Sequence, residues 1–184
     1  MHICTAWVTF LLKIETAPNL KKLYTYDFAK SIREILKKIS EQNLVGLHKI
    51  QILDYSPEKR RKDYYGFYYG RETGEKQPRI VICVNNIIKG YPDFVINRTF
   101  ITKLLLADTL FHEVAHHIQS LRHGINKSKS EDDAKKYVRK MMWKHFKYRI
   151  IFLKVLLSPL AVISSLLIKV SNVIKRINRG RPSF

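Results

Sequence analysis

The stretch of residues 102–122 reads TKLLLADTLFHEVAHHIQSLR. Apolar side chains recur in it at steps of three to four residues, which is typical of a helix with one buried face. His112, Glu113 and His116 lie inside this pattern and form the motif H-E-x-x-H. Four residues make just over one helical turn, so the two histidines project from the same face.

Two imidazoles spaced in this way can bind one zinc ion, and a glutamate directly after the first can reach a water molecule on that ion. The motif therefore favours a hydrolytic zinc site. The simpler interpretation is a pair of histidines on an ordinary helix.

A zinc site of this type needs a third protein ligand, and residues 130–148 contain the main candidate, Glu131. Ser130 is a favourable N-cap, and acidic residues suit the first turn of a helix, so we expect a second helix here. The linker before it contains Gly124 and can reverse the chain. The rival ligands are His123, Asp132 and Asp133, of which the two aspartates are better explained as solvated acids.

The chain resembles the gluzincin metallopeptidases, in particular the minigluzincins and the HtpX-like membrane peptidases. Their pattern is H-E-x-x-H followed by E-x-x-A on the next helix, and it stands here as HEVAH at 112–116 and EDDA at 131–134. The likeness covers about residues 65–148 and implies an α+β, zincin-like catalytic domain. Such a domain has a small mixed sheet, an active-site helix and a following glutamate helix.

By the same resemblance, His112, His116 and Glu131 would bind Zn²⁺, and Glu113 would be the general base. The expected activity is that of a zinc endopeptidase, which hydrolyses peptide bonds through a metal-activated water. Its substrate would be an extended peptide or protein. His117, His123 and His145 are candidates for a further oxyanion donor, and the sequence does not choose among them.

The sequence departs from the HtpX-like pattern at Lys135, where that pattern has an aspartate. The aspartate would orient a metal-bound histidine, so the pattern leaves open how that histidine is supported here. Asp108 lies one helical turn before His112 and is a candidate substitute.

Two other families of zinc protease contain an H-E-x-x-H motif and differ in the third ligand. The metzincin pattern fails, because Gln119 and Arg122 occupy the positions of its glycine and third histidine. SprT-like proteases, which act near DNA, take a later histidine as third ligand, so His123 keeps that alternative open.

Before the active-site helix, the pattern predicts strands at 3–14, 48–55, 64–70 and 79–85 and a helix at 27–43. We expect the strand at 79–85 to lie beside the cleft. An exposed edge there could pair with an extended peptide.

The net charge of +19 is concentrated near the C-terminus, because residues 134–184 contain 13 Lys and Arg and no Asp or Glu. Residues 150–168 are mainly apolar, carry a single charge at Lys154 and are flanked by cationic side chains. We therefore expect a catalytic domain at 1–148 and a basic, apolar helical segment at 149–184. This segment could anchor the chain on an anionic membrane, or cover the cleft of a latent or inactive zinc-binding protein. Nucleic-acid binding is less favoured, because residues 153–181 lack aromatic side chains for base stacking.

The two cysteines, Cys4 and Cys83, lie among apolar residues and form no C-x-x-C motif. Both are expected to be buried thiols of a reducing compartment. The predicted location is therefore cytoplasmic, with membrane association through the C-terminal segment.

Overall fold

The computed structural model describes residues 12–58, 62–70, 74–91, 99–121, 130–152 and 155. Two compact units, Met1–His145 and Phe146–Phe184, make up the chain. The elements in chain order are β1 (Lys13–Thr16), α2 (Pro18–Leu23), α3 (Phe28–Leu36), the 3-10 helix η2 (Glu41–Leu44), β2 (Lys49–Leu53), β3 (Gly66–Tyr69), β4 (Arg79–Cys83), α4 (Val84–Ile88) and α6 (Thr99–Ser120). Residues 130–152 are also helical.

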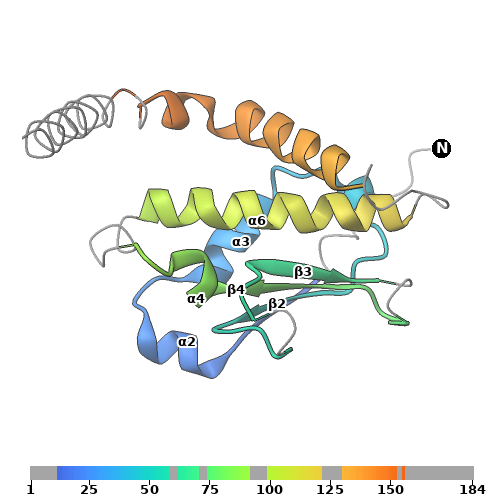
Figure 1. The fold of residues 1–184 in the computed structure, drawn as a ribbon, viewed down its shortest axis with the longest axis horizontal. Helices are drawn as coiled ribbons and strands as arrows, with labels where there is room; N and C mark the ends of the chain where they lie inside the picture. The colour runs from blue at the N-terminus through green and yellow to red at the C-terminus, as the bar shows by residue number, and fades with distance from the viewer. Residues whose placement is uncertain are drawn as a thin grey trace, which may run out of the picture. The chain divides into compact units, whose positions relative to one another are not determined.

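The four strands form one mixed sheet in the order β1-β2-β4-β3 (Figure 1). β1, β2 and β4 are parallel, while β3 runs antiparallel to β4. The expected α+β class with a small mixed sheet is therefore confirmed. β3 stands last in this order and is therefore an edge strand of the described sheet. Its register with β4 pairs Gly66 with Ile82 and Tyr69 with Arg79.

The core lies between the sheet and the helices α3 and α6. β4 reads Arg-Ile-Val-Ile-Cys and is buried from its second residue onwards, as expected for an inner strand covered on both faces. α3 buries its apolar stripe, and Glu34 on α3 forms an ion pair with Lys103 on α6. α6 crosses the sheet along β3 and β4 (Figure 1). The fully buried residues of α6 include Leu106, Leu110, Phe111 and Val114.

Two predictions about the strands and helices were wrong in detail. The strand at 79–85 is not an edge, because β4 pairs with β2 on one side and with β3 on the other. The helix expected at 27–43 ends at Leu36 and is followed by η2.

Some predictions fall outside the part of the chain that the structure describes. The N-terminal strand is seen only from Lys13, and Cys4, His123 and most of the apolar stretch at 150–168 lie outside the described ranges.

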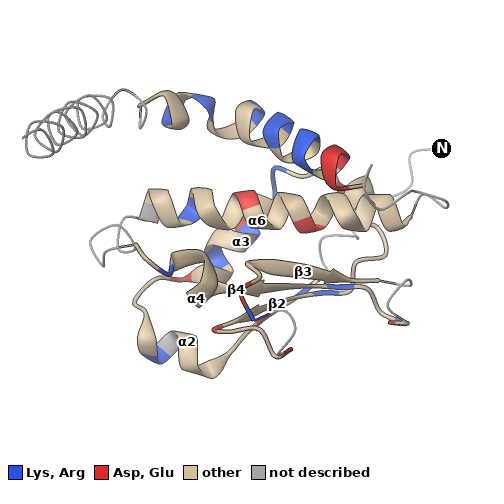
Figure 2. Ribbon diagram, in the orientation of Figure 1, with Lys and Arg blue, Asp and Glu red and all other residues tan. Residues whose placement is uncertain are grey.

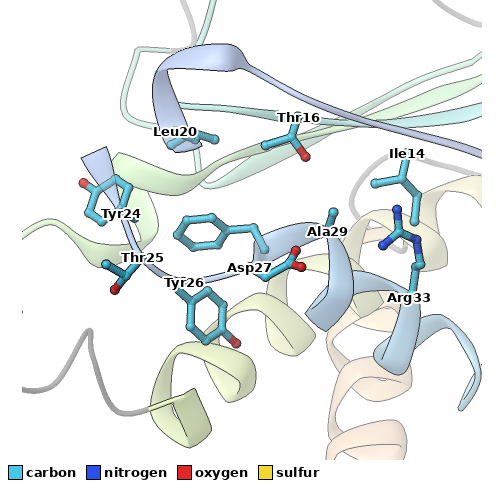
Figure 3. Close-up of a pocket in the computed structure, with 10 residues that line it drawn as sticks. Ile14, Thr16, Leu20, Tyr24, Thr25, Tyr26, Asp27, Ala29 and Arg33 are labelled. Carbon is cyan, nitrogen blue, oxygen red and sulfur yellow. The ribbon is translucent and has the colours of Figure 1, made fainter. Parts of the chain in front are cut away.

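A cavity of about 500 Å³ lies between β1, α2 and the start of α3 (Figure 3). The two tyrosine hydroxyls of its lining are already engaged, Tyr24 with Asn85 and Tyr26 with Ser31. None of its lining residues belongs to β3, β4 or α6, so it is separate from the H-E-x-x-H motif.

Candidate metal centre

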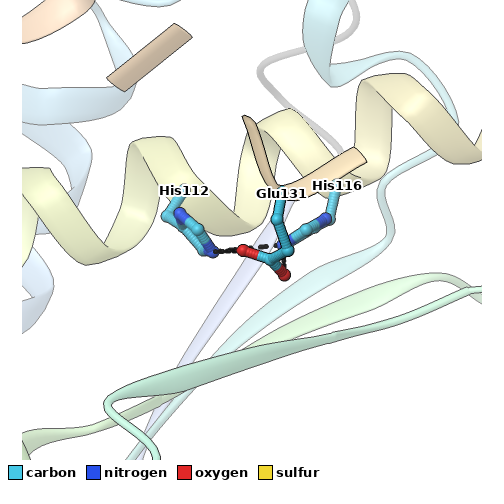
Figure 4. Close-up of side chains that lie close together, drawn as sticks. All are labelled: His112, His116 and Glu131. Atoms are coloured by element: carbon cyan, nitrogen blue, oxygen red, sulfur yellow. Dashed lines mark hydrogen bonds and ion pairs between the residues drawn. The ribbon is translucent and has the colours of Figure 1, made fainter. Parts of the chain in front are cut away.

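The helix α6 brings His112 and His116 together, as their spacing predicts. Their Nε2 atoms lie 3.1 Å apart, and their rings meet edge to face with centroids 4.7 Å apart (Figure 4). The side chains are 29% and 22% exposed, so both are partly shielded and open on one side.

Glu131 completes the cluster from the first turn of the following helix. Its Oε1 lies 3.4 Å from His116 Nε2, and its Oε2 lies 3.6 Å from His112 Nε2 (Figure 4). Among the described residues, these three form the group of His, Cys, Asp and Glu side chains close enough to hold a metal ion. Asp132 and Asp133 are not part of it, and Asp133 instead faces Lys136 at 3.4 Å.

The three donor atoms fit a tetrahedral zinc ion. Zinc bonds of about 2.0–2.1 Å at tetrahedral angles place neighbouring ligand atoms about 3.3 Å apart. The two histidine nitrogens are 3.1 Å apart, and each lies 3.4 or 3.6 Å from a different carboxylate oxygen of Glu131, so all three separations are close to this value. Two imidazole nitrogens and one carboxylate are also a donor set that zinc accepts, together with several other divalent ions.

Glu113 lies on the sheet side of the histidine pair and is only 5% exposed. Its Cγ is close to Gly66, since a Cβ atom at Gly66 would come within 3.2 Å of it. Gly66 begins β3, so Glu113 sits where the edge strand starts. The residues leading into β3 are held by buried Asn86, whose side-chain amide donates to the carbonyls of Lys62 and Tyr64 at 2.7 and 2.8 Å.

Asp108 does not take the orienting role that its position suggested. No hydrogen bond joins it to His112 among the residues described. The two interact through charge alone. Burial raises the pKa of Asp108, and His112 partly opposes this. The pKa of His112 is lowered by burial and by His116, against the opposing charges of Glu131 and Asp108.

Gln119 is a residue of the cluster that the motif did not reveal. Its Oε1 lies 3.1 Å from His116 Nδ1, and its Nε2 donates to the Ser130 carbonyl at 2.7 Å. In the sequence it served only to exclude the metzincin pattern. Its position three residues after His116 places it on the same side of the helix, and this spacing could have indicated a contact between the two side chains.

The other candidate histidines lie elsewhere. His117 is fully buried, and its ring nitrogens face the Val45 carbonyl at 3.0 Å and the Tyr68 hydroxyl at 3.2 Å. It is therefore a packing residue, and it is not free to stabilise an oxyanion. His145 bonds the backbone of Lys38, and burial is the main cause of its lowered pKa.

A smaller cavity of about 270 Å³ borders α6 one turn before the histidines. Asp108 and Thr109 line it from α6, and Tyr65, Ile87 and Tyr91 line it from the segments around β3 and α4. One of its lining residues, Asp108, interacts with His112 of the metal cluster through charge.

Within the described ranges, no helix combines the length and the apolar character that crossing a bilayer requires. Comparison with known proteins gave no match to a family model, to a curated protein or to a solved structure.

Proposed function

We propose that the chain is a zinc-dependent endopeptidase of the gluzincin type. The observation that carries the proposal is the convergence of His112, His116 and Glu131, from two helices, on one point at zinc-like separations. Zinc bound there would supply a Lewis acid that polarises a peptide carbonyl and makes water acidic enough to attack it.

In this proposal Glu113 takes the proton from the attacking water and passes it to the leaving amine. Its place beside Gly66 puts it at the start of the edge strand β3. An extended peptide that pairs with the outer edge of β3 would therefore lie beside Glu113 and the metal site. The cavity bordered by Asp108, Tyr65 and Tyr91 offers room for one of its side chains.

The test measures metal content and hydrolysis on the full chain. Wild type should bind about one zinc per chain and cleave an unfolded substrate such as casein. Glu131→Ala should lose most of the zinc, whereas Asp132→Ala, which changes the neighbouring acid, should keep it. Glu113→Gln should keep the zinc and lose hydrolysis. A wild-type chain that binds no zinc, or a Glu113→Gln variant that cleaves as well as wild type, contradicts the proposal.

A latent or inactive zinc-binding protein is the second candidate, and one observation favours it. The side chain of Glu113 is 5% exposed, which leaves a general base little access to a substrate. Full-length protein that binds one zinc per chain and leaves casein intact would support this candidate. The DNA-associated alternative depends on His123, which lies outside the described residues.

An anionic membrane surface is the proposed partner, at the cytoplasmic face. Lys135, Lys136, Arg139, Lys140 and Lys144 are exposed on the helix that follows Glu131 (Figure 2). In the second unit Tyr148, Phe152 and Val155 are 78%, 63% and 66% exposed. Exposed cations in the first unit and exposed aromatic and apolar groups in the second are each suited to the interface of an anionic bilayer. Sedimentation with phosphatidylserine vesicles, and not with phosphatidylcholine vesicles or DNA, is the expected result.

A further inference from the structure

The side-chain amide of Gln119 lies between the two helices that carry the metal cluster. Its Oε1 faces His116 Nδ1 at 3.1 Å and also accepts a hydrogen bond from the Ser130 hydroxyl. Its Nε2 donates to the Ser130 backbone carbonyl at 2.7 Å. Two of these contacts join α6 to Ser130, the residue directly before Glu131, and the third reaches His116 on α6 itself.

The direction of each bond follows from what the groups can do. The Ser130 carbonyl can only accept, so the NH₂ end of Gln119 must face it, and the oxygen end must face His116. A carbonyl oxygen accepts, so His116 Nδ1 must carry the proton. In the neutral ring this leaves Nε2 of His116 with its lone pair, aimed at the point shared with His112 and Glu131.

The 3.1 Å contact between the two histidines then has one donor. Because His116 Nε2 has no proton, the proton of this hydrogen bond belongs to His112 Nε2 in the metal-free chain. The two rings therefore hold opposite tautomers, and His116 is the one already in the form that a metal requires.

We infer that Gln119 is a positioning residue of the metal centre, which fixes the tautomer of His116 and holds Glu131 in register through Ser130. The inference rests on the proposed function. It also accounts for Lys135, which stands where the HtpX-like pattern has an aspartate that orients a metal-bound histidine. In this chain Gln119, on α6, would orient a metal-bound histidine, and that histidine is His116. Partners of this kind typically contribute 10- to 100-fold to metal affinity.

The experiment combines zinc affinity with the histidine tautomers. Zinc dissociation constants are measured by competition with a chromogenic chelator for wild type, Gln119→Leu, Gln119→Glu and the control Gln42→Leu, which makes the same change at an exposed site. We expect Gln119→Leu to bind zinc about 10- to 100-fold more weakly. Gln42→Leu should match wild type. Gln119→Glu keeps an acceptor for His116 and should recover part of the loss.

Long-range ¹H–¹⁵N spectra of the metal-free chain, recorded at about pH 8.5 where imidazole is neutral, report the tautomers directly. Wild type should show Nδ1–H on His116 and Nε2–H on His112. Gln119→Leu should lose the Nδ1–H form of His116, and Gln119→Glu should keep it. A residue that only packs the two helices together would lower the unfolding temperature without changing the tautomer.

The outcomes separate the two ideas. Wild type without zinc overturns the proposed function and this inference with it. Wild type with one zinc, but with Nε2–H on His116 or with unchanged affinity in Gln119→Leu, overturns the inference alone. The wild-type tautomer decides the question even if Gln119→Leu does not fold.

Discussion

At Gly66 the strand β3 passes close to α6, beside Glu113. A Cβ atom there would lie 2.8 Å from Thr109 Cγ2, 2.9 Å from the Val81 carbonyl oxygen and 3.2 Å from Glu113 Cγ. Real Cβ atoms do not approach other atoms so closely, and the nearest neighbours belong to the helix and the inner strand. The absence of a side chain at this position is therefore what lets the edge strand lie against the proposed base.

Gly66→Ala should accordingly destabilise the protein by an amount near the upper end of the usual 1–3 kcal/mol for overpacking, roughly 3 kcal/mol. The control is Gly74→Ala, where a Cβ meets nothing within 4 Å and the φ of 78° costs only backbone strain. That strain is worth about 1 kcal/mol. Urea unfolding measures the stability of both variants, and Gly66→Ala should be the less stable of the two. A Gly66→Ala variant no less stable than Gly74→Ala would contradict this account.

Cys83 ends β4 with a fully buried side chain, as the sequence predicted. Burial, with smaller effects from the charges of Glu113 and Asp54, raises the pKa of its thiol from 9.0 to about 11. At a pH below both values, the reactive thiolate is therefore about a hundredfold scarcer than in an ordinary thiol.

Alkylation of Cys83 by iodoacetamide at about pH 8 should be at least roughly a hundredfold slower in the native chain than in urea. Peptide mass mapping separates it from Cys4. Equal rates in the native and unfolded states would show that the thiol is accessible and that its environment is not the one described.

At the scale of elements, α6 is fixed to the sheet and to η2 by the ring of His117. Its Nε2 donates to the carbonyl of Val45, the residue after η2, at 3.0 Å. Its Nδ1 faces the hydroxyl of Tyr68 on β3 at 3.2 Å, and that hydroxyl is also 2.8 Å from Ser120 Oγ. The helix that carries the metal ligands is thus held by polar contacts on the side opposite to solvent.

Tyr68→Phe should remove one member of this network and leave the buried Nδ1 of His117 without this partner, at a cost of about 1–3 kcal/mol, while Ser120 Oγ keeps its hydrogen bond to the His117 carbonyl. Tyr65→Phe, at a tyrosine that is 60% exposed, should change the stability little. Unfolding is measured in EDTA, so that metal binding does not contribute. Equal stability of the two variants would mean that the Tyr68 hydroxyl contributes nothing to the attachment of α6.

The limits of sequence interpretation are also clearest at this scale. The helical spacing around Phe111 predicted α6 to within three residues at each end, and the motif placed His112 and His116 on one face. α4 was missed because Val-Asn-Asn-Ile-Ile is short, rich in β-branched residues and continuous with β4. The unbroken apolar run Ile80–Cys83 is typical of an inner strand. The sequence therefore already contained evidence that the strand at 79–85 is not an exposed edge.

The cluster itself was only partly predictable. The helix start at Ser130 made Glu131 the main candidate, and the resemblance supported it, but the sequence of the linker does not determine how the two helices lie against each other. The contact of Gln119 with Ser130 spans eleven residues and depends on how the second helix lies against α6. Side-chain contacts of this type appear only when tertiary structure is known.

At the scale of the whole molecule, histidines and net charge together determine how the chain responds to acid. The formal charge is +19 at neutral pH, and protonation of seven histidines would raise it further. Self-repulsion of this size destabilises a compact state. His112, His117 and His145 each have a pKa lowered chiefly by burial, so all three favour the neutral form in the folded chain.

The sign of the pH dependence follows from proton uptake. In the unfolded chain these histidines take up protons near pH 6.5, whereas in the folded chain they do so only at lower pH. Between the two values the unfolded state binds more protons, so the free energy of unfolding falls as the pH falls. The contribution of the three histidines is thus present above about pH 6.5 and is lost as the pH drops through their folded-state pKa values. Glu15 and Glu34, whose pKa values are lowered by lysine partners, add a further loss only below about pH 4.5.

The urea midpoint of metal-free protein should therefore decrease steadily from about pH 7 to about pH 5, within the window in which histidines titrate. His145→Leu removes one of the three groups without touching the metal cluster, so its midpoint should decrease less steeply over the same range. The comparison also tests the burial of His145, because its Nε2 is a buried atom without a hydrogen-bond partner among the described residues. A midpoint that stays flat or rises between these pH values would mean that the histidines are as accessible to protons in the folded chain as in the unfolded one. A slope unchanged in His145→Leu would assign the acid sensitivity to His112 and His117 alone.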